Sequence, residues 1–180
     1  MVTFIALLRG INVSGHNKIK MANLKQLFLN NGFSEVETYI QSGNVIFKSK
    51  ELNTLKIEQR IITSIEKQFG FTIKVLVLTK TELSTVFSSN PFLDREFIDI
   101  SKLCVTFLSA TPTLETISEI KELGLKNNDE FYLNNNTVYL HCPNGFGKTK
   151  LTNNLFERKF KVNATTRNWK TITKLIELSN

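Results

Sequence analysis

Residues 2–21, VTFIALLRGINVSGHNKIKM, run from an apolar strand through a polar loop into the start of a helix. The strand, residues 2–8, is apolar on both faces, as expected of a buried central strand. The loop contains one arginine, two lysines, one histidine, two glycines and two asparagines. So many hydrogen-bond donors between a buried strand and a helix predict a binding site.

The pattern around this stretch predicts a ferredoxin-like order of elements in the first half of the chain. Apolar residues recur at helical spacing from Met21, and Gly32 suits a left-handed helix end. The next expected elements are strands at 36–40 and 45–48, a helix capped by Asn53 and ending at Phe69, a strand at 71–78, and a short helix opened by Thr79 and Glu82. This order is β-α-β-β-α-β plus one helix.

The second half begins with the same order. A strand at 102–108, a helix at 113–123, strands at 131–133 and 138–142, and a helix near 150–160 are expected, and residues 164–168 lead into a final amphipathic helix. The fold class is therefore α+β, with two ferredoxin-like subdomains of the β-α-β-β-α-β type in one compact chain. The polar stretch 90–101 marks their boundary, giving subdomains 1–95 and 96–180, the second with an extra terminal helix.

Basic residues are concentrated at the two ends of the chain. The net charge is +7, residues 1–34 carry four bases and no acid, and residues 143–180 carry eight bases and two acids. Acids outnumber bases in the middle of the chain. If the two ends meet in the folded protein, they form one positive face that attracts phosphate groups.

Composition excludes several classes of protein. A hydrophobic fraction of 41% and a charged fraction of 22% are those of an ordinary globular domain and exclude disorder. No apolar run is long enough for a membrane span, and the run near the start is too short for a signal peptide. We therefore expect a cytoplasmic protein in which Cys104 and Cys142 are buried, reduced thiols. No group of His, Cys and carboxylate residues has metal-ligand spacing, so we predict neither a metal site nor a cofactor.

Candidate ligand-binding residues come from the loop, from the turn 41–44 and from the segment 145–170. Arg167 can hold a phosphate through two hydrogen bonds, whereas Trp169 is better explained as the first core residue of the last helix. At the turn, ordinary hairpin chemistry is by itself a sufficient explanation. The full set of candidates is Arg9, Asn12, His16, Lys18, Lys20, Gln41, Ser42, Asn44, Lys148, Thr166, Arg167, Asn168 and Trp169.

Residues 145–149, GFGKT, resemble the end of a Walker A phosphate loop between a strand and a helix. That motif needs a glycine five residues before Gly147, where this chain has Cys142. Without that glycine the backbone cradle for the phosphates is too short, so we do not predict an NTPase. A single phosphate contact by Lys148 and Thr149 stays open.

Three stretches resemble hallmark sequences of a bacterial domain-of-unknown-function family, number sixteen-ninety-seven: LLRGINV with NKIKM near the start, YIQSGNV at 39–45, and TTRNWKT at 165–171. The resemblance covers essentially the whole chain and implies two ferredoxin-like α+β subdomains. It also adds weight to the three stretches forming one site, but it implies no biochemical function. Members of the family often carry glycine where this chain has Ser14.

The leading hypothesis is that the protein binds a phosphate-bearing ligand, with nucleic acid slightly favoured over a small molecule. The binding surface is a basic face formed by residues 9–20, 41–44 and 145–170. One alternative is an enzyme acting on a phosphorylated small molecule, with His16 as acid or base. Another is that the polar motifs are mainly structural and join elements through hydrogen bonds. No catalytic constellation is evident, and enzyme activity stays undecided.

Overall fold

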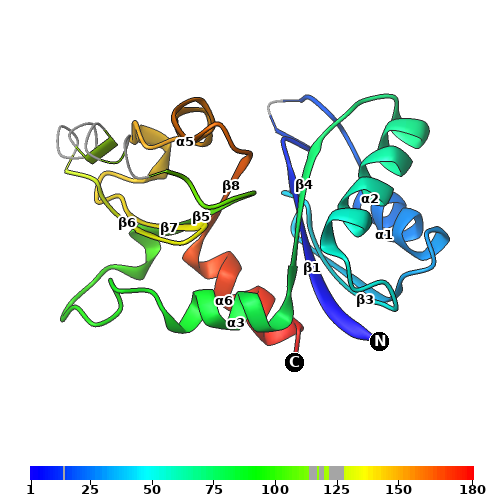
Figure 1. Cartoon of the computed structure of the whole chain (residues 1–180), viewed down its shortest axis with the longest axis horizontal. Helices are drawn as coiled ribbons and strands as arrows, with labels where there is room; N and C mark the ends of the chain where they lie inside the picture. The colour runs from blue at the N-terminus through cyan, green and yellow to red at the C-terminus, as the bar shows by residue number, and fades with distance from the viewer. Residues whose placement is uncertain (14, 114–116, 118–119, 122–127) are drawn as a thin grey trace. The chain divides into compact units, whose positions relative to one another are not determined.

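The computed structural model describes residues 1–13, 15–113, 117, 120–121 and 128–180. The chain forms two compact units: the first is Met1–Thr85 with Leu175–Asn180, and the second is Val86–Lys174. Each unit contains a four-stranded antiparallel sheet (Figure 1). The sequence predicts different limits, with one subdomain at 1–95 and the other at 96–180, and these limits stay a prediction.

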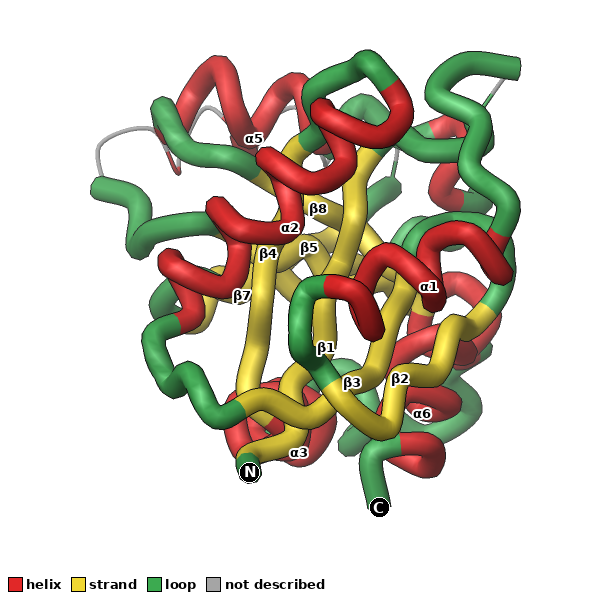
Figure 2. Tube along the Cα trace, turned by 90° about the vertical axis from the view of Figure 1, so that its right-hand side faces the viewer, coloured by secondary structure: helices red, strands yellow, loops and turns green. Residues whose placement is uncertain are grey.

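The first unit follows the predicted β-α-β-β-α-β order and adds a helix. Its sheet has the strand order β2-β3-β1-β4 with every neighbouring pair antiparallel, and α1 and α2 cover one face (Figure 2). The elements are β1 (Val2–Arg9), α1 (Met21–Asn30), β2 (Ser34–Tyr39), β3 (Asn44–Ser49), α2 (Thr54–Phe69), β4 (Lys74–Thr79) and α3 (Lys80–Ser88).

The helix ends follow the predicted capping residues. Asn53 accepts a hydrogen bond from the amide of Lys56 at the start of α2, and Gly70 is left-handed, with φ 77°, at its end. Thr79 and Glu82 form a reciprocal capping box: the Thr79 hydroxyl accepts from the Glu82 amide, and the Glu82 carboxylate accepts from the Thr79 amide. These hydrogen bonds confirm the predicted caps. The caps could be predicted from the sequence because a cap involves only residues that are neighbours in the chain.

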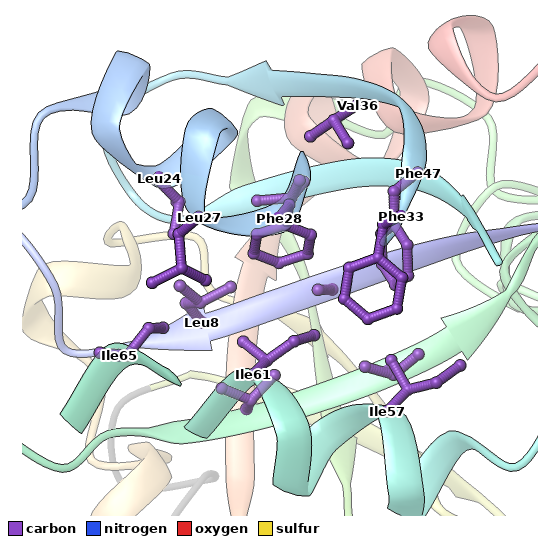
Figure 3. Close-up of a cluster of buried hydrophobic side chains, with 14 of the residues drawn as sticks. Leu8, Leu24, Leu27, Phe28, Phe33, Val36, Phe47, Ile57, Ile61 and Ile65 are labelled. Atoms are coloured by element: carbon purple, nitrogen blue, oxygen red, sulfur yellow. The ribbon is translucent and has the colours of Figure 1, made fainter. Parts of the chain in front are cut away.

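The core of the first unit lies between the sheet and its two helices (Figure 3). Aromatic rings fill its centre, and the centroids of Phe33 and Phe47 are 4.7 Å apart. Because strand side chains alternate between faces, β1 turns every second residue toward the helices: Phe4, Ala6 and Leu8. The helices supply apolar residues at helical spacing: Leu24, Leu27, Phe28, Ile57, Ile61 and Ile65.

The second unit repeats this architecture with the strand order β6-β7-β5-β8. Its sheet packs against α5 (Figure 1) around a core that includes Phe156 and the two cysteines, Cys104 and Cys142, which are buried thiols as expected. The helix expected at 113–123 lies largely outside the described residues. The elements are η1 (Ile100–Lys102), β5 (Leu103–Leu108), β6 (Glu130–Asn134), β7 (Thr137–His141), η3 (Phe146–Lys148), α5 (Asn153–Phe160), β8 (Ala164–Asn168) and α6 (Trp169–Leu178).

The strand β8 corrects one expectation. Residues 164–168, ATTRN, are mostly polar and show no apolar alternation, so the sequence pattern indicates only a connection to the last helix. In the fold they pair antiparallel with β5, where Thr106 lies opposite Thr166 and their hydroxyl oxygens are 2.7 Å apart. With this fourth strand the two sheets have the same order, which confirms the α+β class with two ferredoxin-like subdomains.

The repeat extends to the helix that follows each sheet. Thr79, the last residue of β4, caps α3, and Asn168, the last residue of β8, caps α6 by accepting a hydrogen bond of 2.8 Å from the amide of Thr171. In both units the fourth strand pairs with the first and runs directly into a helix. Among the described residues, the duplication therefore includes six corresponding elements.

Gly43 allows the β2–β3 turn to lie against β1. Its φ is +79°, its carbonyl accepts a hydrogen bond of 2.8 Å from the amide of Leu8, and a Cβ at this position would lie 2.7 Å from the Cβ of Leu8 and 2.9 Å from Cδ1 of Ile11. Any other residue would therefore be strained in its backbone and would also collide with two buried side chains.

The substitution Gly43→Ala should lower the free energy of unfolding by about 2–5 kcal/mol. The cost is the sum of two contributions, the strain of a left-handed alanine backbone and the overpacking caused by its methyl group. Gly32→Ala is the matched control: it has the same φ of +79° but nothing within 4 Å of the added Cβ. The control should cost only about 1–2 kcal/mol. Urea denaturation of both variants measures the difference, and equal losses would contradict the steric explanation.

Candidate functional site

The polar loop between β1 and α1 is closed by the side chain of Asn12. This residue is left-handed, with φ 55°, and its Nδ2 donates to the carbonyl of Ile19 at 2.9 Å and to the carbonyl of Gln41 at 3.0 Å. Its Oδ1 accepts from the amide of Ile19 at 2.9 Å. One carboxamide thus joins the beginning of the loop to its end and to the β2–β3 turn.

Further hydrogen bonds order the interior of the loop. Asn17 is also left-handed, its Nδ2 donates to the carbonyl of Gly10 at 3.0 Å, and its carbonyl accepts from the amide of Asn12 at 3.2 Å. Ile11 and Ile19 anchor the loop in the core, since their side chains are buried. The chain can therefore hold charged side chains at defined positions in this loop.

A hollow of about 620 Å³, which we call the loop hollow, lies beside this loop in the first unit. Its lining includes four of the predicted site residues: Asn12, Lys18, Lys20 and Gln41. It also includes residues that are not among the predicted site residues: Gly15, Ile19, Met21, Asn23 and Phe69. Phe69 ends a helix far along the chain, so no local signal could have placed it here, whereas Asn23 lies one turn from Lys20.

The polar side chains of the loop hollow are available to a ligand. Within the described part of the chain, no hydrogen bond or ion pair engages the side chains of Lys18, Lys20, Asn23 or Gln41. The two lysines are exposed, and no carboxylate is among the described residues that line the hollow. Within that lining, the two lysines therefore have no opposite charge to pair with.

The first turn of α1 adds to this positive character. Lys20 occupies the N-cap position of a helix of 10 residues, but its side chain makes no capping hydrogen bond, and the first turn contains no acidic residue. The amides at a helix start point outward and carry partial positive charge, which favours an anion. Three sources of positive potential, two ammonium groups and one helix start, thus meet at the loop hollow.

The other predicted residues of the first unit lie outside the lining of the hollow. Arg9 is half-buried at the end of β1, and His16 is exposed, with no partner for its imidazole among the described residues. Asn44 is fully buried and donates to the carbonyl of Tyr39 at 3.1 Å and to the hydroxyl of Ser42 at 3.0 Å. Asn44 and Ser42 are therefore engaged in shaping the turn.

In the second unit, the predicted residues of β8 and α6 are mostly engaged within the fold. The Arg167 guanidinium is buried, which lowers its pKa to about 10, and its Nη1 donates to the carbonyl of Thr166 at 3.0 Å. The Thr166 hydroxyl also donates to Asn153 at 2.6 Å. Trp169 is buried and stacks on Phe87, with ring centroids 5.1 Å apart, as the core interpretation expects.

The GFGKT stretch forms a 3-10 turn and a buried corner. Lys148 is exposed, but the Thr149 hydroxyl donates to the buried carboxylate of Asp129 and accepts from the amide of Leu151 at 2.9 Å. The next helix, α5, begins only at Asn153. Thr149 therefore donates to one oxygen of a buried carboxylate and does not open a helix, in contrast to the threonine of a Walker A loop.

The second unit contains an ion-pair network that no sequence motif predicts. Arg95 donates two hydrogen bonds to Glu130, of 2.8 and 2.9 Å, and Nδ1 of His141 lies 3.0 Å from the same carboxylate. Hydrogen bonding to Arg95, with a further contribution from His141, lowers the pKa of Glu130 to about 2. The network fastens the segment before β5 to the β6–β7 hairpin.

The comparisons with known proteins agree with this fold. The family described as Protein of unknown function (DUF1697) matches residues 1–139, so the chain belongs to that family. A similar solved structure is that of the conserved bacterial protein SP0830 from Streptococcus pneumoniae, with a TM-score of 0.76 and 26% sequence identity over 99% of each chain. No match was found among curated proteins.

Two features are absent from the described residues. No helix there combines the length and the apolar character needed to cross a bilayer. In the same residues, no group of three or more His, Cys, Asp or Glu side chains is arranged to hold a metal ion.

The Asn12 side chain should matter for stability, whereas the Gln41 side chain should not. Asn12→Ala leaves the Ile19 amide and two carbonyls without their partner and should lower the free energy of unfolding by about 1–3 kcal/mol. Gln41→Ala, the control at the rim of the same hollow, should leave the melting temperature unchanged, because no bond engages that side chain. An unchanged melting temperature in Asn12→Ala would contradict the closing role of Asn12.

Stability should fall in acid through Glu130. Its folded-state pKa of about 2 lies below its ordinary value of 4.5, so the carboxylate contributes stability above the ordinary value. That contribution is lost as the pH falls through the window between the two values. Thermal unfolding should be measured between about pH 6 and about pH 2, a range that covers both the ordinary and the folded-state pKa of this carboxyl group. The melting temperature of Glu130→Gln should depend less steeply on pH than that of the wild type. The control Glu96→Gln, at an exposed carboxylate, should follow the wild type.

Proposed function

We propose that the first unit binds a phosphate-bearing ligand in the loop hollow. The observation that carries the proposal is that Lys18, Lys20 and the uncapped start of α1 meet in one hollow. Among the described residues, neither lysine side chain has a partner and no carboxylate is in the lining. Phosphate groups are attracted to lysine ammonium groups and to helix N-termini for the same electrostatic reason. The ordered loop reduces the conformational entropy that binding has to overcome.

The wider form of the proposal adds the basic residues of the segment 145–170 in the second unit and extends to nucleic acid as a ligand. The concentration of bases at the two ends of the chain supports it, and so does the exposure of Lys148. The burial of Arg167 and Trp169 argues against a direct part for these two side chains. The loop hollow is therefore the centre of the proposed site, and Lys18 and Lys20 are its principal residues.

Calorimetric titration with pyrophosphate tests this proposal. The wild type should bind saturably, and Lys18→Ala and Lys20→Ala should each weaken binding on the order of tenfold, because each removes a charge-assisted hydrogen bond. Lys50→Ala is the matched control, since Lys50 is exposed in the same unit but does not line the hollow. The proposal would be refuted if the wild type did not bind pyrophosphate, or if a variant carrying both Lys18→Ala and Lys20→Ala bound it as tightly as the wild type.

A further inference from the structure

The loop hollow has an apolar part that a bare phosphate does not need. Met21 and Phe69, both partly buried, lie in its lining beside the buried Ile19. The Phe69 ring is supported from within the unit by Phe71, whose centroid is 6.2 Å away at an interplanar angle of 25°. An aromatic ring and a thioether at the edge of a basic site are suited to a flat, polarisable group.

The hollow also presents two unengaged carboxamides. Asn23 and Gln41 come from different elements, the first from α1 and the second from the β2–β3 turn, and both are exposed. A carboxamide offers one acceptor and two donor hydrogens, a combination that pairs with the polar edge of a nucleobase. The ring N–H and amino groups of a nucleobase can donate to the carbonyl oxygens of these carboxamides, and its ring nitrogens and carbonyls can accept from their amino groups.

The size of the hollow favours a single nucleotide. A volume of about 620 Å³ falls within the range typical of sites for small molecules and cofactors. Two lysines are sufficient for one or two phosphate groups, whereas single-stranded nucleic acid is held along an extended basic groove with several stacked bases. Among the described residues, the loop hollow has one aromatic ring in its lining, that of Phe69.

We infer that the ligand of the loop hollow is a nucleoside phosphate, with its phosphate groups at Lys18 and Lys20 and its base against Phe69 and Met21. Asn23 and Gln41 then contribute hydrogen bonds to the base. This inference rests on the proposed function, because it identifies the class of ligand for the same site.

The test compares pyrophosphate with ADP, GDP, CDP and UDP in calorimetric titrations of the full chain. At least one nucleotide should bind about tenfold or more tightly than pyrophosphate, because stacking of its base on the Phe69 ring adds to the phosphate contacts. If pyrophosphate binds and no nucleotide binds more tightly, the inference is overturned while the proposed function stands. If none of the five compounds binds, both are overturned.

Variants separate the two parts of the site. Phe69→Leu, which keeps an apolar side chain, should weaken the preferred nucleotide about tenfold and leave pyrophosphate unchanged. Gln41→Ala, at an exposed position, should act in the same direction and avoids any loss of folding. Equal losses for both ligands, or no loss in either variant, would contradict the assignment of the base. If a mixed-sequence oligonucleotide displaces every nucleotide, the inference of a single nucleoside phosphate is overturned and the ligand is a nucleic-acid strand.

Discussion

The carboxamide of Asn12 is the constraint on which the candidate site depends. Its three hydrogen bonds, of 2.9 to 3.0 Å, join the beginning of the loop, its end and the β2–β3 turn. The backbone at this residue is left-handed, a conformation that asparagine adopts more readily than most other residues with a side chain, so the backbone geometry also favours Asn12. Lys18, Lys20 and the start of α1 keep their places through this closure.

Burial divides the polar motif residues into two groups with different roles. A buried polar atom needs a hydrogen-bond partner, so Asn44 and Thr149 are engaged with neighbours inside the fold. Exposed side chains have no such requirement, and Lys18 and Gln41 extend into the loop hollow without a partner among the described residues. The same stretches of sequence therefore contain both the scaffold and the groups that a ligand can meet.

The two units show how little sequence identity a repeated fold requires. Each sheet has its first strand in the same central position, and each fourth strand leads into a helix capped by the last strand residue, Thr79 or Asn168. The two units share a pattern of buried faces and helix caps. Many different combinations of residues can form this pattern. Thr166 in β8 lies opposite Thr106, a hydroxyl pair that stabilises a strand without any apolar alternation.

The sequence by itself determined the elements whose signals are local: the apolar strand β1, the helices with caps at Asn53 and Thr79, and the order that defines a ferredoxin-like fold. It also indicated the loop between β1 and α1 as the richest polar stretch. Only the tertiary structure decided that β8 is a strand, because its polar residues acquire their partners from β5. It likewise brought Phe69 beside Lys18 and engaged Asn12 with the turn, since contacts between distant residues depend on packing and leave no periodic signal in the chain.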